Sequence, residues 1–222
     1  MKYLLITSIV WLLFTVHNFA QKPQRAFKCG YPTKDTSELK QFYKNNLSLI
    51  EVKNGERIAS VGAMNGYQEV QIAIMKDGID WTIQDIDTTC LNQVEFSKVF
   101  NYYEKMKGSP IIGKFSLLLG DETKTNLLED SYDRVLLINV YHELTDKSAI
   151  LTDIHRALKK NGRLVIMEFV AKKKGQKRKD CKHIKPWEPD FLKELETLNF
   201  KFIDRKRQNE KHLLSFYTFE RI

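Results

Sequence analysis

Two glycines, Gly62 and Gly66, lie where a short apolar run gives way to a helical pattern in the sequence VGAMNGY. Glycines in such a turn can take positive φ angles and let the backbone approach a ligand closely. The amide groups at the start of the following helix would favour an anion or a carboxylate. The spacing therefore indicates a ligand-binding turn, although an ordinary tight turn between a strand and a helix could contain the same pair.

An acidic residue stands at the distance from this turn that a nucleoside ligand would require. Asp85 lies 23 residues after Gly62, close to the spacing of roughly 20 residues at which a carboxylate holds ribose hydroxyls. Asp87 could take the same role, and capping of the segment that begins at Thr88 or Thr89 is the structural alternative. Together, the turn and the acid favour a nucleoside ligand.

Further polar side chains follow two later apolar runs. Asp121 lies two residues after the run that ends at Leu119, and it could accept a hydrogen bond from an adenine amino group. Asn139, Tyr141 and His142 follow the next run and would face the mouth of a pocket. His142 could equally be a structural histidine whose hydrogen bonds are satisfied within the protein.

These residues need a scaffold that brings the ends of several strands together. Strands are predicted by continuous apolar runs at 58–61, 81–84, 115–119, 134–140 and 163–169. A helix is expected over 148–159, closed by the sequence KKNG, with lysines in its last turn and a glycine after its end. Continuous apolar strands alternating with helices predict an α/β fold, a mainly parallel sheet covered on both faces. Ligands bind such sheets at the carboxyl ends of the strands.

The first twenty residues are set apart from the predicted fold. A basic Lys2 precedes an apolar stretch at residues 3–16, and Ala20 ends the segment. This stretch is short for a membrane span and is typical of a signal-peptide core. We therefore predict a signal peptide over 1–20 and an exported protein, periplasmic or secreted. The alternative is a membrane anchor formed by residues 3–16.

The chain contains three cysteines, Cys29, Cys90 and Cys181. No two of them have CxxC spacing, so we predict no structural zinc site and assign no metal ligands. One disulfide is possible in an oxidising compartment and would leave a single thiol. The sequence does not select the pair.

Positive charge is concentrated in one segment. The formal net charge is +8, and residues 172–185 contain eight Lys and Arg residues and one Asp, which is +7. Lys-rich segments can bind anionic lipid or other polyanions. No aromatic residue is interleaved before Trp187, so base stacking is not supported and nucleic acid is not expected as a partner. A solvated loop is the alternative.

Five segments occur in an order that is specific in combination: IASVGAMNGY, QDID, LLLGDET, YDRVLLINVYHEL and HRALKKNGRLVIMEF. They resemble the motifs of class I S-adenosylmethionine-dependent methyltransferases, and they are most similar to a subgroup with VADIGAGTGY as first motif and VYH after the fourth strand. The resemblance implies a Rossmann-like sheet of seven strands, mostly parallel, with helices on both faces and the last strand antiparallel. It places the methyltransferase-like domain at 57–222, and the polar residues 21–56, which contain a helical stretch, are predicted to form an N-terminal helical extension.

The resemblance also implies roles for the candidate residues. It assigns binding of S-adenosyl-L-methionine to Ser60, Gly62, Ala63, Gly66, Asp85, Asp121 and Asn139. Asp85 would hold the ribose hydroxyls, and Asn139 would lie beneath the sulfonium. The methyl acceptor would enter over Tyr141, His142, Glu168 and His183, and Tyr141, His142 and His183 are the candidate catalytic residues.

The chain departs from the family at two positions of the first motif. The family has an acidic residue at position 60 and a glycine at position 64, where this chain has Ser60 and Met64. The implied function is methyl transfer to an unknown acceptor. The alternative is a non-catalytic, exported binding protein on the same fold, engaging anionic surfaces through residues 172–185.

Overall fold

Seven strands form one sheet in the part of the chain that the computed structural model describes, residues 26–207 and 214–222. The strands are β1 (Arg57–Val61), β2 (Ile79–Asp85), β3 (Gly113–Leu119), β4 (Tyr132–Ile138), β5 (Leu158–Phe169), β6 (Phe200–Arg207) and β7 (Leu214–Arg221). Their order in the sheet is β3-β2-β1-β4-β5-β7-β6. The pairs among β1 to β5 are parallel, and β7 is antiparallel to both of its neighbours, β5 and β6. The predicted Rossmann-like sheet of seven mostly parallel strands is therefore confirmed.

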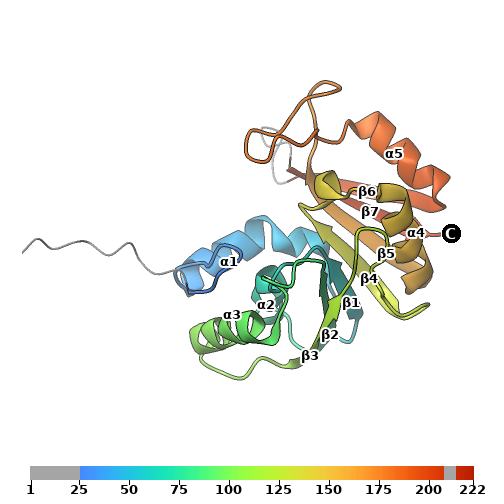
Figure 1. Ribbon diagram of the computed structural model, residues 1–222. Helices are drawn as coiled ribbons and strands as arrows, with labels where there is room; N and C mark the ends of the chain where they lie inside the picture. Colours follow the sequence, from blue (N-terminus) through green and yellow to red (C-terminus); the bar gives the residue numbers. More distant parts are fainter. Residues whose placement is uncertain (1–25, 208–213) are drawn as a thin grey trace, which may run out of the picture.

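Helices cover both faces of this sheet (Figure 1). They are α1 (Thr36–Asn45), α2 (Tyr67–Ala73), α3 (Gln93–Lys107), α4 (Lys147–Ala157) and α5 (Glu188–Thr197), with short 3₁₀ helices η1 (Leu47–Ile50) and η2 (Tyr141–Glu143). Buried Leu39, Val70 and Val99 place α1, α2 and α3 in one apolar cluster. Leu151 and Leu195 place α4 and α5 in the cluster on the opposite face. The strand ends are thus held between two packed layers.

The longest helix shows how local signals set the element boundaries. The side chain of Asn92 accepts a hydrogen bond from the backbone amide of Glu95 and caps the start of α3. Gly108 ends the helix with φ 73°, a left-handed conformation that favours glycine. The apolar spacing of residues 94–103 predicts a long helix that ends at Gly108, and the structure confirms this end.

The sequence KKNG does not close a helix. Helix α4 ends at Ala157, and the chain enters β5 at Leu158, which pairs with Tyr132 of β4. The left-handed residue here is Asn161, with φ 63°. The prediction of a helix over 148–159 is wrong at its end because pairing with β4 satisfies the backbone groups that a helical cap would otherwise satisfy.

A disulfide ties the N-terminal segment to the loop after β2. Cys29 and Cys90 are bonded, with 5.8 Å between their Cα atoms, and Cys181 is a free thiol. The carbonyl of Cys29 also accepts a hydrogen bond of 2.8 Å from the side-chain amide of Asn65. A loop of 61 residues corresponds to about 4 kcal/mol of loop-closure stabilisation in the chain-entropy model. The segment is therefore fastened beside the turn that follows β1.

The predicted signal peptide, residues 1–20, and the alternative anchor, residues 3–16, lie outside the described residues. Within residues 26–207 and 214–222, no helix has the length and apolar character needed to cross a membrane.

Candidate functional site

The turn after β1 has the conformation expected of a glycine-based turn. Gly62 and Gly66 take left-handed φ angles of 70° and 75°. A Cβ atom on Gly62 would lie 2.3 Å from Cγ2 of Val140, so only glycine fits at this position. Met64, between the two glycines, is also left-handed with φ 53°, and a side chain there adds conformational strain. Gly66 donates its amide to the carbonyl of Ala63 at 2.9 Å, which closes the turn ahead of α2.

Asp85 is the acid that this turn contacts. Its Oδ2 accepts a hydrogen bond of 2.7 Å from the amide of Met64, and its Oδ1 accepts from the amides of Ile86 and Asp87 at 2.7 and 2.9 Å. The carboxylate is nearly buried and shapes the turn directly. Asp87 instead accepts from the amide of Thr89, which is the local capping role considered as the alternative.

Three exposed apolar side chains surround Asp85. Met64, Ile86 and Leu119 are 42, 51 and 49% exposed. Met64 and Ile86 donate amides to the carboxylate, and Leu119 is the register partner of Asp85 on β3. Contiguous exposed apolar surface with polar groups beside it is a feature of ligand-binding grooves and interaction sites. A carboxylate flanked by apolar side chains suits a nucleoside, with a sugar at the acid and a base on the apolar surface.

A cavity of about 80 Å³ lies next to this group and is lined by Gly62, Gln84, Asp121 and Glu122, among others. Ligand pockets usually measure about 300–1,000 Å³, so this cavity can hold only part of a nucleoside. The side chain of Gln84 is buried, and its Oε1 has no hydrogen-bond partner among the described residues. Gln84 is a binding candidate that sequence reasoning missed, although a polar residue near the end of an apolar strand was a visible signal.

Asp121 lines the cavity, but its carboxylate caps its own loop. Oδ1 accepts hydrogen bonds of 2.7 and 2.8 Å from the amides of Thr123 and Lys124. These amide bonds, together with the Thr123 hydroxyl, lower the pKa of Asp121. The predicted contact with adenine stays a prediction.

A buried carboxyl group lies beside Ser60, where the family has its acid. The hydroxyl of Ser60 bonds to Oε1 of Glu69 on α2 at 2.6 Å, and both residues are buried. Oε2 of Glu69 has no hydrogen-bond partner among the described residues. Burial raises the pKa of Glu69 to about 7, and the Ser60 hydrogen bond opposes that rise. Helix α2 thus brings a carboxyl group next to the strand position at which the resemblance implies an acid.

The basic segment, residues 172–185, contacts residues at the C-terminal ends of β4 and β5. Arg178 is buried, and its Nη1 donates to Oδ1 of Asn139 at 2.7 Å and lies 3.3 Å from Oε1 of Glu168. Its Nη2 pairs with Asp180 at 2.7 Å. The alternative of a solvated loop is therefore wrong for Arg178, because its guanidinium is paired with a fully buried carboxylate. The amide predicted to lie beneath the sulfonium is held by this arginine.

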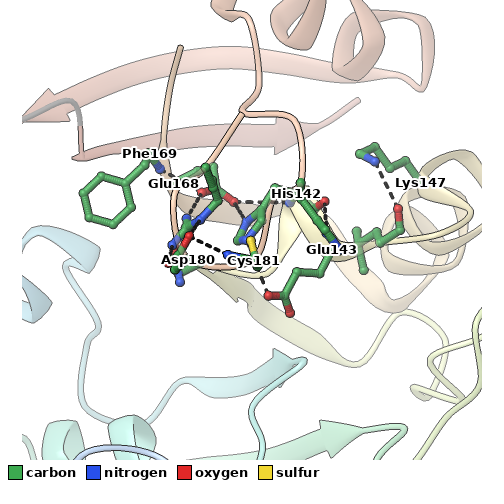
Figure 2. Close-up of polar contacts among 11 residues, drawn as sticks. His142, Glu143, Lys147, Glu168, Phe169, Asp180 and Cys181 are labelled. Atoms are coloured by element: carbon green, nitrogen blue, oxygen red, sulfur yellow. Dashed lines mark hydrogen bonds and ion pairs between the residues drawn. The ribbon is translucent and has the colours of Figure 1, made fainter. Parts of the chain in front are cut away.

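The ring of His142 contacts the second carboxylate oxygen of Glu168 (Figure 2) and lies near the ring of His183. Nδ1 of His142 is 2.7 Å from Oε2 of Glu168, and both side chains are buried. Nδ1 of His183 is 3.1 Å from the carbonyl oxygen of His142, and the two rings are 5.9 Å apart. The structure therefore brings these two candidate catalytic residues to one edge of the sheet.

Tyr141 is the third candidate catalytic residue, and its hydroxyl is hydrogen-bonded within the protein. It donates to the carboxylate of Glu194 on α5. Burial, and then this contact, raise the pKa of Tyr141 above its usual value, so the phenol stays protonated. Tyr141 and His142 line a cavity of about 310 Å³ together with Trp187 and Phe191. This cavity has the size of a small-molecule pocket.

A family model of the methyltransferase domain matches residues 72–166, and no curated protein matches the chain. Among solved structures, a SAM-dependent methyltransferase from Aquifex aeolicus aligns at TM-score 0.62 and 15% identity, over 86% of this chain and 100% of that one. One from Methanosarcina mazei aligns at TM-score 0.61 and 13% identity, over 80% and 97%. The chain has the class I methyltransferase fold.

Similarity at these identities shows the methyltransferase fold alone, and the match over residues 72–166 supports the family. The matched range includes Asp85, Asn139 and His142 but begins after the turn at 62–66. The cyclase SpnF also aligns, at TM-score 0.60 and 13% identity, over 82% of this chain and 80% of its own. The fold therefore does not by itself define the reaction.

Replacing Glu69 by glutamine tests the buried carboxyl group. Between its ordinary pKa of 4.5 and about 7, the folded protein keeps a proton on Glu69 that the unfolded chain has lost. The contribution of this group to the free energy of unfolding therefore falls as the pH rises, by about 1.4 kcal/mol per pH unit. We expect the Glu69→Gln protein to lack this decrease and to be more stable than the parent at about pH 8, measured by denaturant unfolding.

Glu196→Gln makes the same charge change at an exposed position and should leave the pH dependence of stability unchanged. A Glu69→Gln protein that retains the parent's slope between about pH 5 and 7 would show that Glu69 does not carry this proton.

Proposed function

We propose that this protein binds S-adenosyl-L-methionine and transfers its methyl group to an acceptor bound in the neighbouring cavity. The observation that carries the proposal is the nearly buried Asp85 carboxylate surrounded by exposed Met64, Ile86 and Leu119. This arrangement suits a sugar that donates hydroxyl groups to the acid and an apolar base that covers the side chains. The match of residues 72–166 to the methyltransferase domain supports this ligand.

Different residues at the strand ends would bind different parts of the cofactor. Asp85 would hold the ribose, and the unpartnered Oε1 of Gln84 would accept a hydrogen bond from an amino group. Glu69 lies beneath the turn, where Ser60 has replaced the family's acid, and its carboxyl group would favour the cationic end of the ligand. When bound, the cofactor would supply an electrophilic methyl group.

The acceptor would occupy the cavity of about 310 Å³ beside Tyr141 and His142. Methyl transfer depends chiefly on the alignment of the acceptor atom with the methyl group. Trp187 and Phe191 offer apolar surface in this cavity. Its charged lining residues are three lysines and two acids, so positive charge prevails: Lys147, Lys174, Lys185, Asp190 and Glu194. These walls favour an acceptor with an apolar part and an anionic part.

The alternative is a non-catalytic binding protein on the same fold, and one contact favours it. The guanidinium of Arg178 bonds to Asn139, where the resemblance places the positively charged sulfonium. Two positive charges close together repel each other, although Glu168 and Asp180 offset the charge of Arg178. Such a protein would bind S-adenosylhomocysteine, whose thioether sulfur is uncharged, more tightly than S-adenosylmethionine.

Calorimetric titration with both S-adenosyl compounds tests the proposal, using the chain from Gln21 onward. Asp85→Asn keeps the side-chain size but removes the charge, and we expect it to weaken binding of S-adenosylmethionine by about 1.5–3 kcal/mol, or about 10- to 150-fold. Asp87→Asn is the matched control because the carboxylate of Asp87 accepts its hydrogen bond from the amide of Thr89 in its own loop. If the parent binds neither compound, or if the two variants lose affinity equally, the assignment of the site is wrong.

We also propose that the exposed lysines of the basic segment bind anionic surfaces. Those lysines are Lys172, Lys173, Lys174, Lys177, Lys179 and Lys182. A cluster of cations next to the acceptor cavity would bring the protein to an anionic membrane or polymer. Arg178 does not belong to this surface because it is buried against Glu168.

Replacing Lys172, Lys173, Lys177 and Lys179 by glutamine should weaken binding to anionic phospholipid vesicles at least tenfold, since each lysine near such a surface contributes about 1 kcal/mol. Binding should also fall as salt is added. The control replaces four exposed lysines elsewhere, Lys40, Lys44, Lys53 and Lys76. Equal losses in the two variants, measured by vesicle sedimentation, would mean that net charge and not this segment drives binding.

We propose further that the protein is exported and that residues 1–20 are removed. The bond between Cys29 and Cys90 supports this location, because disulfides persist in oxidising compartments. Intact protein recovered from the cell envelope should have a mass that lacks residues 1–20 and should contain a single reactive thiol, Cys181. A mass that retains these residues would favour the membrane anchor.

A further inference from the structure

We propose that His142, Glu143 and Cys181 form a binding site for a divalent transition-metal ion, with zinc as the best fit. The proposal does not depend on methyl transfer. His142 and Glu143 lie on η2 after β4, whereas Cys181 lies in the loop before α5. The ligand atoms of the three side chains all lie within 4.8 Å of one another (Figure 2). Nitrogen, oxygen and sulfur are the donors that zinc takes from proteins.

The imidazole ring of His142 has the orientation of a metal-bound histidine. Its Nδ1 lies 2.7 Å from Oε2 of Glu168, and the tautomer that donates the Nδ1 hydrogen to this carboxylate carries its lone pair on Nε2. A carboxylate behind the imidazole is the usual second contact of a metal-bound histidine. Glu168 is itself held by Arg178 and by the amide of Phe169. The ring is therefore fixed before any ion arrives.

Nε2 of His142 has no hydrogen-bond partner among the described residues, although its side chain is only 1% exposed. A buried polar atom without a partner is costly, so it needs an explanation. The neighbour of Nε2 is Oε1 of Glu143, at 3.4 Å. Nitrogen and oxygen ligands of a tetrahedral zinc ion are about 3.3 Å apart, given bonds of about 2.0–2.1 Å. These two atoms already have the spacing of two zinc ligands.

Cys181 would supply the third ligand. It is the free cysteine of the chain, partly exposed, and it follows Asp180, whose carboxylate accepts its amide at 2.9 Å. Its Sγ would move by no more than about 1.3 Å from the 4.8 Å limit to reach bonding geometry, given a Zn–S bond of about 2.3 Å. Binding would convert the thiol to the thiolate.

The charges that touch the cluster favour a dication. Arg178 contributes one positive charge, whereas Glu143, Glu168 and Asp180 each contribute a negative one when ionised, so the sum is −2 before Cys181 is counted. Three protein ligands leave a fourth position for water or for another molecule. His142 also lines the cavity of about 310 Å³. The open position would therefore serve an electron-pair donor in that cavity, and His142 would act as a ligand instead of a base.

Cobalt titration of the tag-free chain from Gln21 onward tests the site, after removal of metals with a chelator and without reductant, so that the disulfide persists. We expect Co²⁺ to bind with a thiolate-to-cobalt charge-transfer band and with the visible bands of a tetrahedral site, and Zn²⁺ to displace it. Cys181→Ser should abolish the thiolate band, and Glu143→Gln should weaken Zn²⁺ binding at least tenfold in calorimetry. Both substituted side chains are partly exposed, so circular dichroism should show an unchanged fold.

Glu196→Gln, which changes an exposed glutamate far from the cluster in sequence, should bind both ions as the parent does. Bound Zn²⁺ should also protect Cys181 from alkylation. If no thiolate band appears, or if Cys181→Ser and Glu143→Gln bind Zn²⁺ as tightly as the parent, the proposal is overturned and the cluster is a structural ion pair. Because no S-adenosyl compound is present, these results stand apart from the proposed methyl transfer.

Discussion

Glu168 lies fully buried at the end of β5, and a carboxylate in that position requires partners. Arg178 approaches it from one side at 3.3 Å and His142 from the other at 2.7 Å. Removing one partner of such a buried group typically costs about 3–5 kcal/mol, because the other charge stays uncompensated. This one side chain therefore fixes the basic segment, the orientation of the histidine ring and, through Arg178, the amide of Asn139.

The turn after β1 also contacts a buried carboxylate that needs hydrogen-bond partners, and here backbone amides are the partners. The carboxylate of Asp85 accepts hydrogen bonds from Met64, Ile86 and Asp87. The residue expected to hold a ribose is thus also the residue that shapes the turn. A ligand that bonds to Asp85 would share the carboxylate with the amides, since each oxygen has two lone pairs. Ligand binding and the local stability of the turn are coupled at this residue.

The basic segment has two structural roles that cannot be distinguished from its amino-acid composition. Arg178 is buried and satisfies Glu168, whereas the lysines on either side of it are exposed. The same segment also contributes Cys181 and His183, which lie next to His142. One loop therefore supplies side chains to the site and cations to the surface. An anionic surface bound by these cations would lie next to the acceptor cavity.

Local chain geometry could be predicted from the sequence because it depends on neighbouring residues. The strand runs, the turn at Gly62 and Gly66, the end of α3 at Gly108 and the acid at Asp85 all follow from spacing and residue type. The cap predicted at KKNG is wrong because strand pairing between β4 and β5 competes with it. Even a strong local signal yields to a contact made by a distant segment.

Which distant residues meet was decided by the tertiary structure alone. Three contacts join segments whose proximity cannot be predicted from residue spacing. They are the bond between Cys29 and Cys90, the carboxyl group of Glu69 beside Ser60, and the position of Cys181 beside His142. A CxxC rule could not reveal a cluster whose members lie on η2 and on a later loop. The sheet brings the carboxyl ends of its strands to one edge, so residues far apart along the chain share one environment there, and only the folded chain determines that environment.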